Sequence, residues 1–259
     1  MLVEILNGKN IFYIFGMAAL VSIFWYYLIC GILYLILTLD DRWRIYRTQL
    51  RMPDRRTLWG EIYHGTVSCL AASLSITLNI WCYQHGWSRM TTRYDQLSFG
   101  EHLEYSFWVW AITEVYQWWY HKMCHHWQIL WRFHRFHHLY SNPTPFTVLC
   151  DHPVDMFFKS SPLFWIPLII PVWDVTLYGW YGFVHLIYGA YLHSGYEIPW
   201  LPSKTSRWFV SSWHHNVHHS LNIPKNFCFY TRILDVLFDT NYDYEPQMPQ
   251  EQFSSGSPL

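Results

Sequence analysis

The feature that most restricts the fold of this chain is an uninterrupted apolar run near the N-terminus. From Ile11 to Leu39, 29 consecutive residues carry no charged side chain. A bilayer core is crossed by about 20 apolar residues in a helix, and a helix satisfies its own backbone hydrogen bonds in lipid. The run is too long for the apolar part of a cleavable signal peptide, roughly 7–15 residues, and no small-residue cleavage site follows it. We therefore expect a retained membrane anchor here.

Further apolar runs follow the anchor. Residues 66–83 form a second run of 18 residues without charge, and residues 103–120 form a third, interrupted by two glutamates. Residues 162–173 contain three prolines, which predicts a broken or re-entrant helix, and residues 175–192 form a last run. Across the chain 52% of residues are hydrophobic and 14% are charged, against roughly 25% charged in a soluble domain. The pattern predicts an all-α integral membrane protein with about four transmembrane helices.

Basic residues near these runs predict the orientation of the chain. Six arginines lie between residues 40 and 56, directly after the first run, whereas the segment before it has a single lysine. Because basic residues are enriched in cytosolic loops, we expect the arginine-rich loop on the cytosolic side. The basic residues of later loops place residues 121–159 on the same side. With a formal net charge of −1, the chain has no polybasic field for a nucleic acid.

Sixteen histidines are distributed unevenly, and ten of them fall within residues 121–138 and 214–219. They form three clusters with the spacings HxxxH, HxxHH and HxxHH. On a helix, residues four apart lie on one face about 5–6 Å apart, so such a pair can reach one metal while a third histidine reaches a neighbouring metal. The eight candidate ligands, enough for two metals, are His121, His125, His134, His137, His138, His215, His218 and His219.

Imidazole ligands do not identify the metal, since zinc, copper, iron and nickel all accept them. No ligand histidine begins an HExxH pattern, which removes the simplest zinc hydrolase. A membrane metal transporter or metal-binding protein without redox chemistry is an alternative, although it needs polar ligands at membrane depth along a pathway. A lone histidine is usually structural, which is how we interpret His64, His85 and His102. The pattern leaves open the roles of His126, His185 and His214.

From about residue 114 to residue 240, the chain resembles the membrane fatty acid hydroxylase and sterol desaturase superfamily. The order HxxxH, HxxHH, HxxHH marks that superfamily, and here it occupies residues 121–125, 134–138 and 215–219. The segments NPTPF and HPVD that follow the second cluster are similar to a part of sterol C-5 desaturases. The stretch after the third cluster is similar to the usual pattern, with departures at Leu234, Cys228 and Asp239.

The resemblance implies a dinuclear non-haem iron centre, with two Fe ions, that uses dioxygen to desaturate or hydroxylate a lipid. A sterol is the implied substrate, with a C-5 desaturase-like reaction, and a fatty-acyl or sphingolipid hydroxylase of the same superfamily is the alternative. The three clusters would ligate the irons, and His193 would be a ninth ligand. Glu114, seven residues before the first cluster, would orient a ligand imidazole or serve as a packing carboxylate. A separate electron donor is implied, which in eukaryotic relatives is cytochrome b5 with its reductase.

These expectations divide the chain into three regions. Residues 1–113 are expected to form an N-terminal membrane anchor region with spans near 11–39 and 66–83, and residues 114–240 a catalytic domain. Residues 241–259 are expected to be a disordered tail, since they are rich in Pro, Ser and Gln. The catalytic domain is expected to include a cytosolic helical cap that holds the metal site. The membrane is expected to be the endoplasmic reticulum in a eukaryote or the inner membrane in a bacterium.

Overall fold

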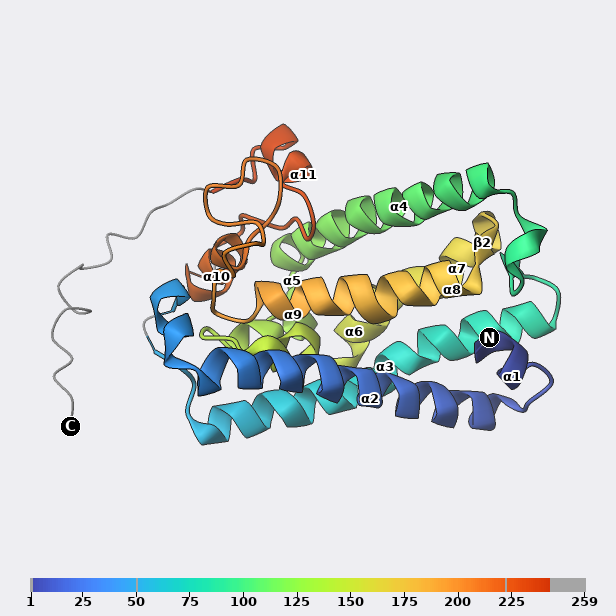
Figure 1. Cartoon of the computed structure of the whole chain (residues 1–259), viewed down its shortest axis with the longest axis horizontal. Helices are drawn as coiled ribbons and strands as arrows, with labels where there is room; N and C mark the ends of the chain where they lie inside the picture. The colour runs from blue at the N-terminus through green and yellow to red at the C-terminus, as the bar shows by residue number, and fades with distance from the viewer. Residues whose placement is uncertain (1, 50, 222, 243–259) are drawn as a thin grey trace, which may run out of the picture.

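The computed structural model describes residues 2–49, 51–221 and 223–242, and the chain is mainly helical there. The long helices run along the longest axis of the molecule, and several short ones gather at one end (Figure 1). The predicted tail lies almost entirely outside the described residues. The first half of the chain contains α1 (Leu2–Leu6), α2 (Ile11–Leu39), η1 (Asp41–Tyr46), α3 (Arg55–Gln84), β1 (Met90–Thr91), η2 (Tyr94–Gln96), α4 (Phe99–His126) and α5 (Gln128–His134). The second half contains η3 (His137–Leu139), η4 (Pro145–Leu149), α6 (Pro153–Ser160), α7 (Pro162–Ile169), β2 (Val172–Trp173), α8 (Asp174–Gly179), η5 (Trp180–His185), α9 (Leu186–Leu192), α10 (Ser212–Leu221) and α11 (Ile233–Leu237).

The first two apolar runs form the two longest helices. α2 has 29 residues and α3 has 30, and both are long and apolar enough to cross a membrane. Asn10 and Asp54 each accept a hydrogen bond from an amide in the first turn of the helix that follows, which satisfies amides that the helix leaves free. Because Asp54 caps α3, this helix begins at Arg55 rather than at residue 66, where the second apolar run begins.

α2 and α3 pack closely side by side (Figure 1). A side chain at Gly65 on α3 would place its Cβ 2.0 Å from the hydroxyl oxygen of Tyr26 on α2, so only glycine admits this contact. The Tyr26 hydroxyl donates a hydrogen bond to the carbonyl oxygen of Phe146 at 2.8 Å. This bond ties the two long helices to η4, the short helical turn that precedes α6.

The later apolar runs form less regular elements. The third lies within α4, a helix of 28 residues. α7 contains Pro167 and ends at Ile169, and the chain then passes through β2, so the predicted broken helix is confirmed. Residues 174–192 are helical throughout, with a π-helical stretch in η5. In the described part of the chain, two helices have the length and apolar character of a membrane span, against the about four expected from the sequence.

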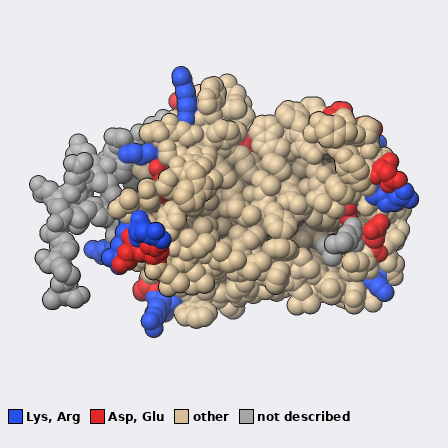
Figure 2. All heavy atoms as spheres, viewed as in Figure 1, with Lys and Arg blue, Asp and Glu red and all other residues tan. Residues whose placement is uncertain are grey.

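Charged side chains gather at the two ends of the molecule. Figure 2 shows them at both ends of the long axis, separated on this face by a broad band almost without them. Large apolar side chains of α2 are exposed, including Phe12 at 83%, Leu20 at 64% and Phe24 at 58%. Monomeric soluble proteins rarely expose large contiguous apolar surfaces. The arrangement fits helices that face lipid.

The two ends carry different elements. The parallel pair of β1 and β2, with Met90 opposite Val172, lies at the end far from α10 and α11 (Figure 1). α4 runs from this end to the other, which brings the first histidine cluster close to α10. The expected boundary between residues 113 and 114 falls inside α4. The two expected regions therefore share one continuous helix.

Candidate metal centre

Nine histidine side chains from distant parts of the sequence meet at the end of the molecule that carries α5 and α10 (Figure 1). They come from the C-terminal part of α4, from α5 and η3, from the residue after α9, and from α10. They form two groups, and within each group the ligand nitrogens all lie within 4.8 Å of one another. The five-histidine group consists of His121, His125, His134, His138 and His218. The four-histidine group consists of His137, His193, His215 and His219.

Both HxxHH clusters contribute to both groups. In the second cluster, the two histidines that are four residues apart join the five-histidine group, and His137 joins the four-histidine group. In the third cluster the assignment is reversed, and His218 alone joins the five-histidine group. All three pairs with a spacing of four stay together. His121 and His125 lie on one face of α4, and His215 and His219 lie on one face of α10, as the helical spacing predicts. His134 ends α5 and His138 lies in η3, so their meeting depends on the turn between these elements. The groups are also in contact, because the rings of His138 and His219 stack with their centroids 4.9 Å apart.

Nitrogen atoms of the four-histidine group face one another at the separations of a shared metal. Nε2 of His193 lies 3.1 Å from Nε2 of His137 and 2.9 Å from Nε2 of His215. Nε2 of His219 lies 3.2 Å from that of His215. Two nitrogens that bind one metal at about 2.0–2.1 Å lie roughly 3.0–3.4 Å apart, depending on the coordination geometry. The four rings therefore present their Nε2 atoms at distances that one ion can bridge.

Ring nitrogens of the five-histidine group are buried without a hydrogen-bond partner. This is true of both nitrogens of His138 and of the Nε2 atoms of His121, His125, His134 and His218. A buried polar atom without a partner is costly, and an ion at the centre of the group removes that cost. These unpaired nitrogens show that the residues fit a metal.

Hydrogen-bond acceptors at the opposite ring nitrogen hold several ligands in place. Nδ1 lies 3.0 Å from a backbone carbonyl oxygen in His121, 2.7 Å in His193 and 2.7 Å in His218. A carbonyl oxygen only accepts, so Nδ1 carries the proton. Nε2 then keeps the lone pair that a metal requires.

Two buried carboxylates face two further ligands, one in each group. Oδ2 of Asp155 lies 2.9 Å from Nδ1 of His134, in the five-histidine group. In the four-histidine group, Nδ1 of His137 forms its hydrogen bond with the Cys150 carbonyl oxygen at 3.3 Å, and Oδ1 of Asp151 is a charged neighbour at the same distance. Contacts of this kind fix the orientation of a metal-binding imidazole.

One lysine joins these two carboxylates. Nζ of Lys159 lies 2.5 Å from Oδ1 of Asp151 and 3.7 Å from Oδ2 of Asp155. No motif in the sequence points to Asp151 or Lys159, and Asp155 stands out only as part of the HPVD segment. The available signal is their regular spacing of four residues, which places Asp155 and Lys159 on one face of α6.

Burial controls protonation at the site. It lowers the pKa of His215 and His219 well below the ordinary value, and it lowers the pKa of His218 to about 3. These rings are therefore neutral at pH 7, and their lone pairs are available to a metal. Burial also acts to lower the pKa of Lys159, but the two carboxylates outweigh it and raise this pKa, so the ammonium stays charged.

An apolar cavity of about 450 Å³ extends from the histidines between α2, α3, α6 and the helical segment α8–α9. One ligand of the five-histidine group, His121, lies in its wall. Three ligands of the four-histidine group also line it: His137, His193 and His215. Its volume is in the range of cavities that hold small molecules, about 300–1,000 Å³.

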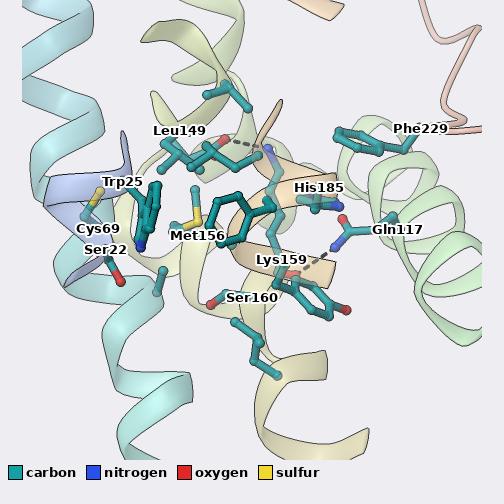
Figure 3. Close-up of a pocket in the computed structure, with 18 of the residues that line it drawn as sticks. Ser22, Trp25, Cys69, Gln117, Leu149, Met156, Lys159, Ser160, His185 and Phe229 are labelled. Carbon is teal, nitrogen blue, oxygen red and sulfur yellow. Dashed lines mark hydrogen bonds and ion pairs between the residues drawn. The ribbon is translucent and has the colours of Figure 1, made fainter. Parts of the chain in front are cut away.

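Lys159 occupies the middle of this cavity wall. Figure 3 shows its side chain between Trp25 and Met156 on one side and Gln117 and His185 on the other. The Gln117 amide donates to the backbone carbonyl oxygen of Lys159 at 2.8 Å, which fixes this part of α6 against α4. The lysine therefore contacts the cavity with its stem and the carboxylates with its ammonium.

Glu114 holds a loop rather than an imidazole. Its carboxylate accepts hydrogen bonds from the amide of Tyr230 at 3.1 Å and from the amide and hydroxyl of Thr231 at 2.7 and 2.8 Å. This is the packing role that the sequence left open. The same loop includes Phe227, whose carbonyl oxygen faces His121.

The histidines whose roles the sequence leaves open lie outside both groups. His126 is exposed, and its Nδ1 faces a backbone carbonyl oxygen. His214 is buried, and its Nδ1 lies 2.9 Å from the Ser211 hydroxyl. His185 lies in the cavity wall and stacks on Phe229 at 4.1 Å. Also outside both groups are the histidines expected to be structural, His64, His85 and His102.

Comparison with known proteins matches the part of the chain that carries these histidines. The model of the family described as fatty acid hydroxylase matches residues 106–240, just over half of the 259 residues. The chain belongs to the fatty acid hydroxylase family. All nine clustered histidines of this family member lie within the matched residues.

Curated relatives of this fatty acid hydroxylase family member are named for reactions on sterols. Lathosterol oxidase of Mus musculus is 32% identical over 126 residues, which cover 47% of this chain and 40% of that protein. Methylsterol monooxygenase 1-1 of Arabidopsis thaliana is 26% identical over 138 residues, 52% of this chain and 46% of that protein. The match therefore spans less than half the length of these relatives. No solved structure matches the chain.

Proposed function

We propose that this protein is a membrane-bound non-haem di-iron oxidoreductase that uses dioxygen to desaturate or hydroxylate a lipid. The observation that carries this proposal is the convergence of nine histidines into two groups at the wall of an apolar cavity. The family match and the sterol-modifying relatives support the reaction class.

The nine imidazoles would hold two irons, one in each group. When bound, the irons supply the activation of dioxygen and the removal of hydrogen from the substrate. The chain itself orients the ligands, since four carbonyl oxygens and the carboxylate of Asp155 hold the Nδ1 atoms of five of the nine rings. Burial keeps the imidazoles neutral and keeps bulk water away from the four-histidine group.

The cavity is suited to a lipid. Aromatic side chains such as Trp25, Phe183 and Phe229 line it, and ligand histidines form part of the same wall. An apolar molecule in this cavity is shielded from water while one of its carbon–hydrogen bonds lies near the metal groups. Because the relatives are named for lathosterol and methylsterol, we propose a sterol substrate and a C-5 desaturase-like reaction. Hydroxylation of a fatty-acyl lipid or sphingolipid is the alternative.

The reaction class needs two electrons from outside the chain, which we propose come from a donor such as cytochrome b5 with its reductase. The two long apolar helices and the band almost free of charge in Figure 2 support an integral membrane protein. The arginines after α2 support a cytosolic orientation of the site. We place the protein in the endoplasmic reticulum of a eukaryote or the inner membrane of a bacterium.

The test is an assay of the purified chain in lipid nanodiscs with an electron donor. Iron per chain is measured first, and the protein is then incubated with lathosterol, a methylsterol or a fatty-acyl lipid under ¹⁸O₂ or nitrogen. We expect two irons per chain, one for each group, and oxygen-dependent desaturation or hydroxylation of a sterol detected by mass spectrometry.

Two outcomes contradict the proposal. A preparation that holds two metals and changes none of these lipids argues against an oxygenase. Metal flux into proteoliposomes that is lost in His121→Ala supports the metal transporter instead. Conversion of a fatty-acyl lipid but not of a sterol keeps the chemistry and changes the substrate.

A further inference from the structure

The carboxylates behind the two histidine groups share a single ammonium. Asp155 faces the five-histidine group through His134, and Asp151 faces the four-histidine group through His137. Nζ of Lys159 lies within 4.0 Å of both carboxylates. Apart from histidines, it is the only basic group among the described residues that forms an ion pair with either of them.

Burial makes this sharing important. The side chains of Asp151 and Asp155 are 0% exposed, and that of Lys159 is 19% exposed. Asp155 also accepts a hydrogen bond from the Tyr120 hydroxyl at 2.7 Å. Buried carboxylates are costly unless a charge compensates them, and two neighbouring ones resist being ionised together.

A charge balance shows what Lys159 contributes. If both carboxylates are counted as ionised, the net charge of this cluster is −1 with Lys159 and −2 without it. Without the ammonium between them, the two carboxylates repel each other, and one of them moves away from its imidazole. That movement removes a polar contact that positions a metal-binding ring.

We propose that Lys159 is a positioning residue for both metal groups, holding one carboxylate behind a ligand of each. This inference rests on the proposed function, because it takes both histidine groups to be metal sites. The inference predicts different effects for Lys159 and for the carboxylates, because each carboxylate faces a ligand in only one group. The loss of either carboxylate therefore affects mainly one metal, and the loss of Lys159 affects both.

The experiment titrates Co²⁺ into the full-length, metal-depleted protein in detergent. Bound cobalt per chain and visible absorption are measured, since four-coordinate and five-coordinate Co²⁺ absorb differently. Removing an outer partner of a ligand typically weakens metal binding by roughly 10–100-fold. We expect that loss at both groups in Lys159→Met, mainly at the five-histidine group in Asp155→Asn, and mainly at the four-histidine group in Asp151→Asn.

Two variants keep the test decisive. Lys122→Met removes the same charge one residue from His121, but its ammonium lies over the Trp118 ring at 4.7 Å, so we expect binding like that of the wild type. Lys159→Met combined with Asp151→Asn restores a single negative charge. We expect it to bind one Co²⁺, in the five-histidine group, more tightly than Lys159→Met does.

The results separate this inference from the proposed function. Wild-type affinity at either group in Lys159→Met overturns the inference. So does a double variant that binds no better than the single one, including the case in which Lys159→Met does not fold and the double variant does not fold either. Two metals in the wild type without lipid turnover contradict the proposed function and leave the role of Lys159 intact.

Discussion

The two histidine groups differ in their surroundings. All four residues of the four-histidine group are buried, and three of them line the apolar cavity. In the five-histidine group only two residues are fully buried. One of the others, His125, lines a second hollow of about 210 Å³, and the side chain of Trp131 forms another part of its wall. The four-histidine group is thus enclosed beside the apolar cavity, and the five-histidine group lies closer to the surface.

This difference gives the centre two sides. Ligands of the four-histidine group dominate the histidine part of the apolar cavity wall, so we expect an apolar molecule to approach from that side. The second hollow borders the five-histidine group through His125, so we expect a water-soluble molecule to approach from there. The rings of the two groups nevertheless touch, so the two approaches converge on one centre.

Loss of a single ligand from either group has the largest expected effect. We expect His134→Ala and His219→Ala each to lower turnover at least about 100-fold, since a ligand is removed outright whereas an outer partner alone accounts for 10–100-fold. Iron should fall from two per chain towards one in both variants, because each removes a ligand from a different group. Metal analysis and the sterol assay in nanodiscs measure the two effects.

His85→Ala is the matched control for these variants. His85 lies outside both groups, and its Nδ1 faces the Trp81 carbonyl oxygen at 2.8 Å. Turnover and iron content should stay within about twofold of the wild type, as for most surface changes. An equal loss in His85→Ala, His134→Ala and His219→Ala would mean that the two groups have no special role.

Blocking the cavity should separate substrate binding from metal binding. Gly182 lines the cavity, and a Cβ at this position meets no atom within 4 Å, so the ring of Gly182→Phe has room to enter the space where substrate would lie. We expect turnover to fall about tenfold or more, since displaced substrate loses its reactive geometry, while both irons remain. Gly16→Phe is the control, because Gly16 on α2 also has an open surrounding and lies outside the cavity wall. Loss of iron in Gly182→Phe would contradict a purely steric effect.

The sequence was informative where function depends on local spacing. All eight histidines of the three clusters fall in the two groups. For the pairs within α4 and α10, a spacing of four residues on one helix is itself the geometric constraint. The ninth, His193, has no such spacing and came only from the resemblance. The helix at Ile11–Leu39 and the break near Pro167 were also predictable. The length of an apolar run and the effect of a proline on its own helix can both be read from neighbouring residues.

Features that depend on tertiary contacts were not predictable in the same way. The partner of Glu114 is a loop more than 100 residues later, and nothing near Glu114 in the sequence identifies it. Nothing in the sequence around Lys159 distinguishes it from the other basic residues of segment 121–159. Its position near both groups arises because α6 packs against α3 and α5, which no local pattern encodes.

The rate at which a chelator removes each metal is a smaller effect, and it directly tests whether the two histidine groups differ in exposure to solvent. We expect a water-soluble iron chelator to remove the two metals in two phases, first from the five-histidine group. Trp131 lies 5.1 Å from the His125 ring and 5.6 Å from the His138 ring, so Trp131→Ala should speed the first phase roughly threefold and leave the second unchanged. Trp127→Ala is the control, since Trp127 is exposed but does not line the hollow. A single phase, or a change in both phases, would mean that the groups do not differ in access.

His126 provides the smallest effect and defines the edge of the five-histidine group. It adjoins His125 in the sequence and lines the same hollow, yet its Nδ1 faces the Lys122 carbonyl oxygen at 2.8 Å and it belongs to neither group. We expect His126→Ala to retain both irons and to change turnover by less than about twofold, as is usual for an exposed side chain. Iron analysis, turnover and the rate of the first chelator phase measure this. Loss of one iron in His126→Ala would contradict this expectation. It would make His126 a sixth ligand of the five-histidine group, located at the second hollow.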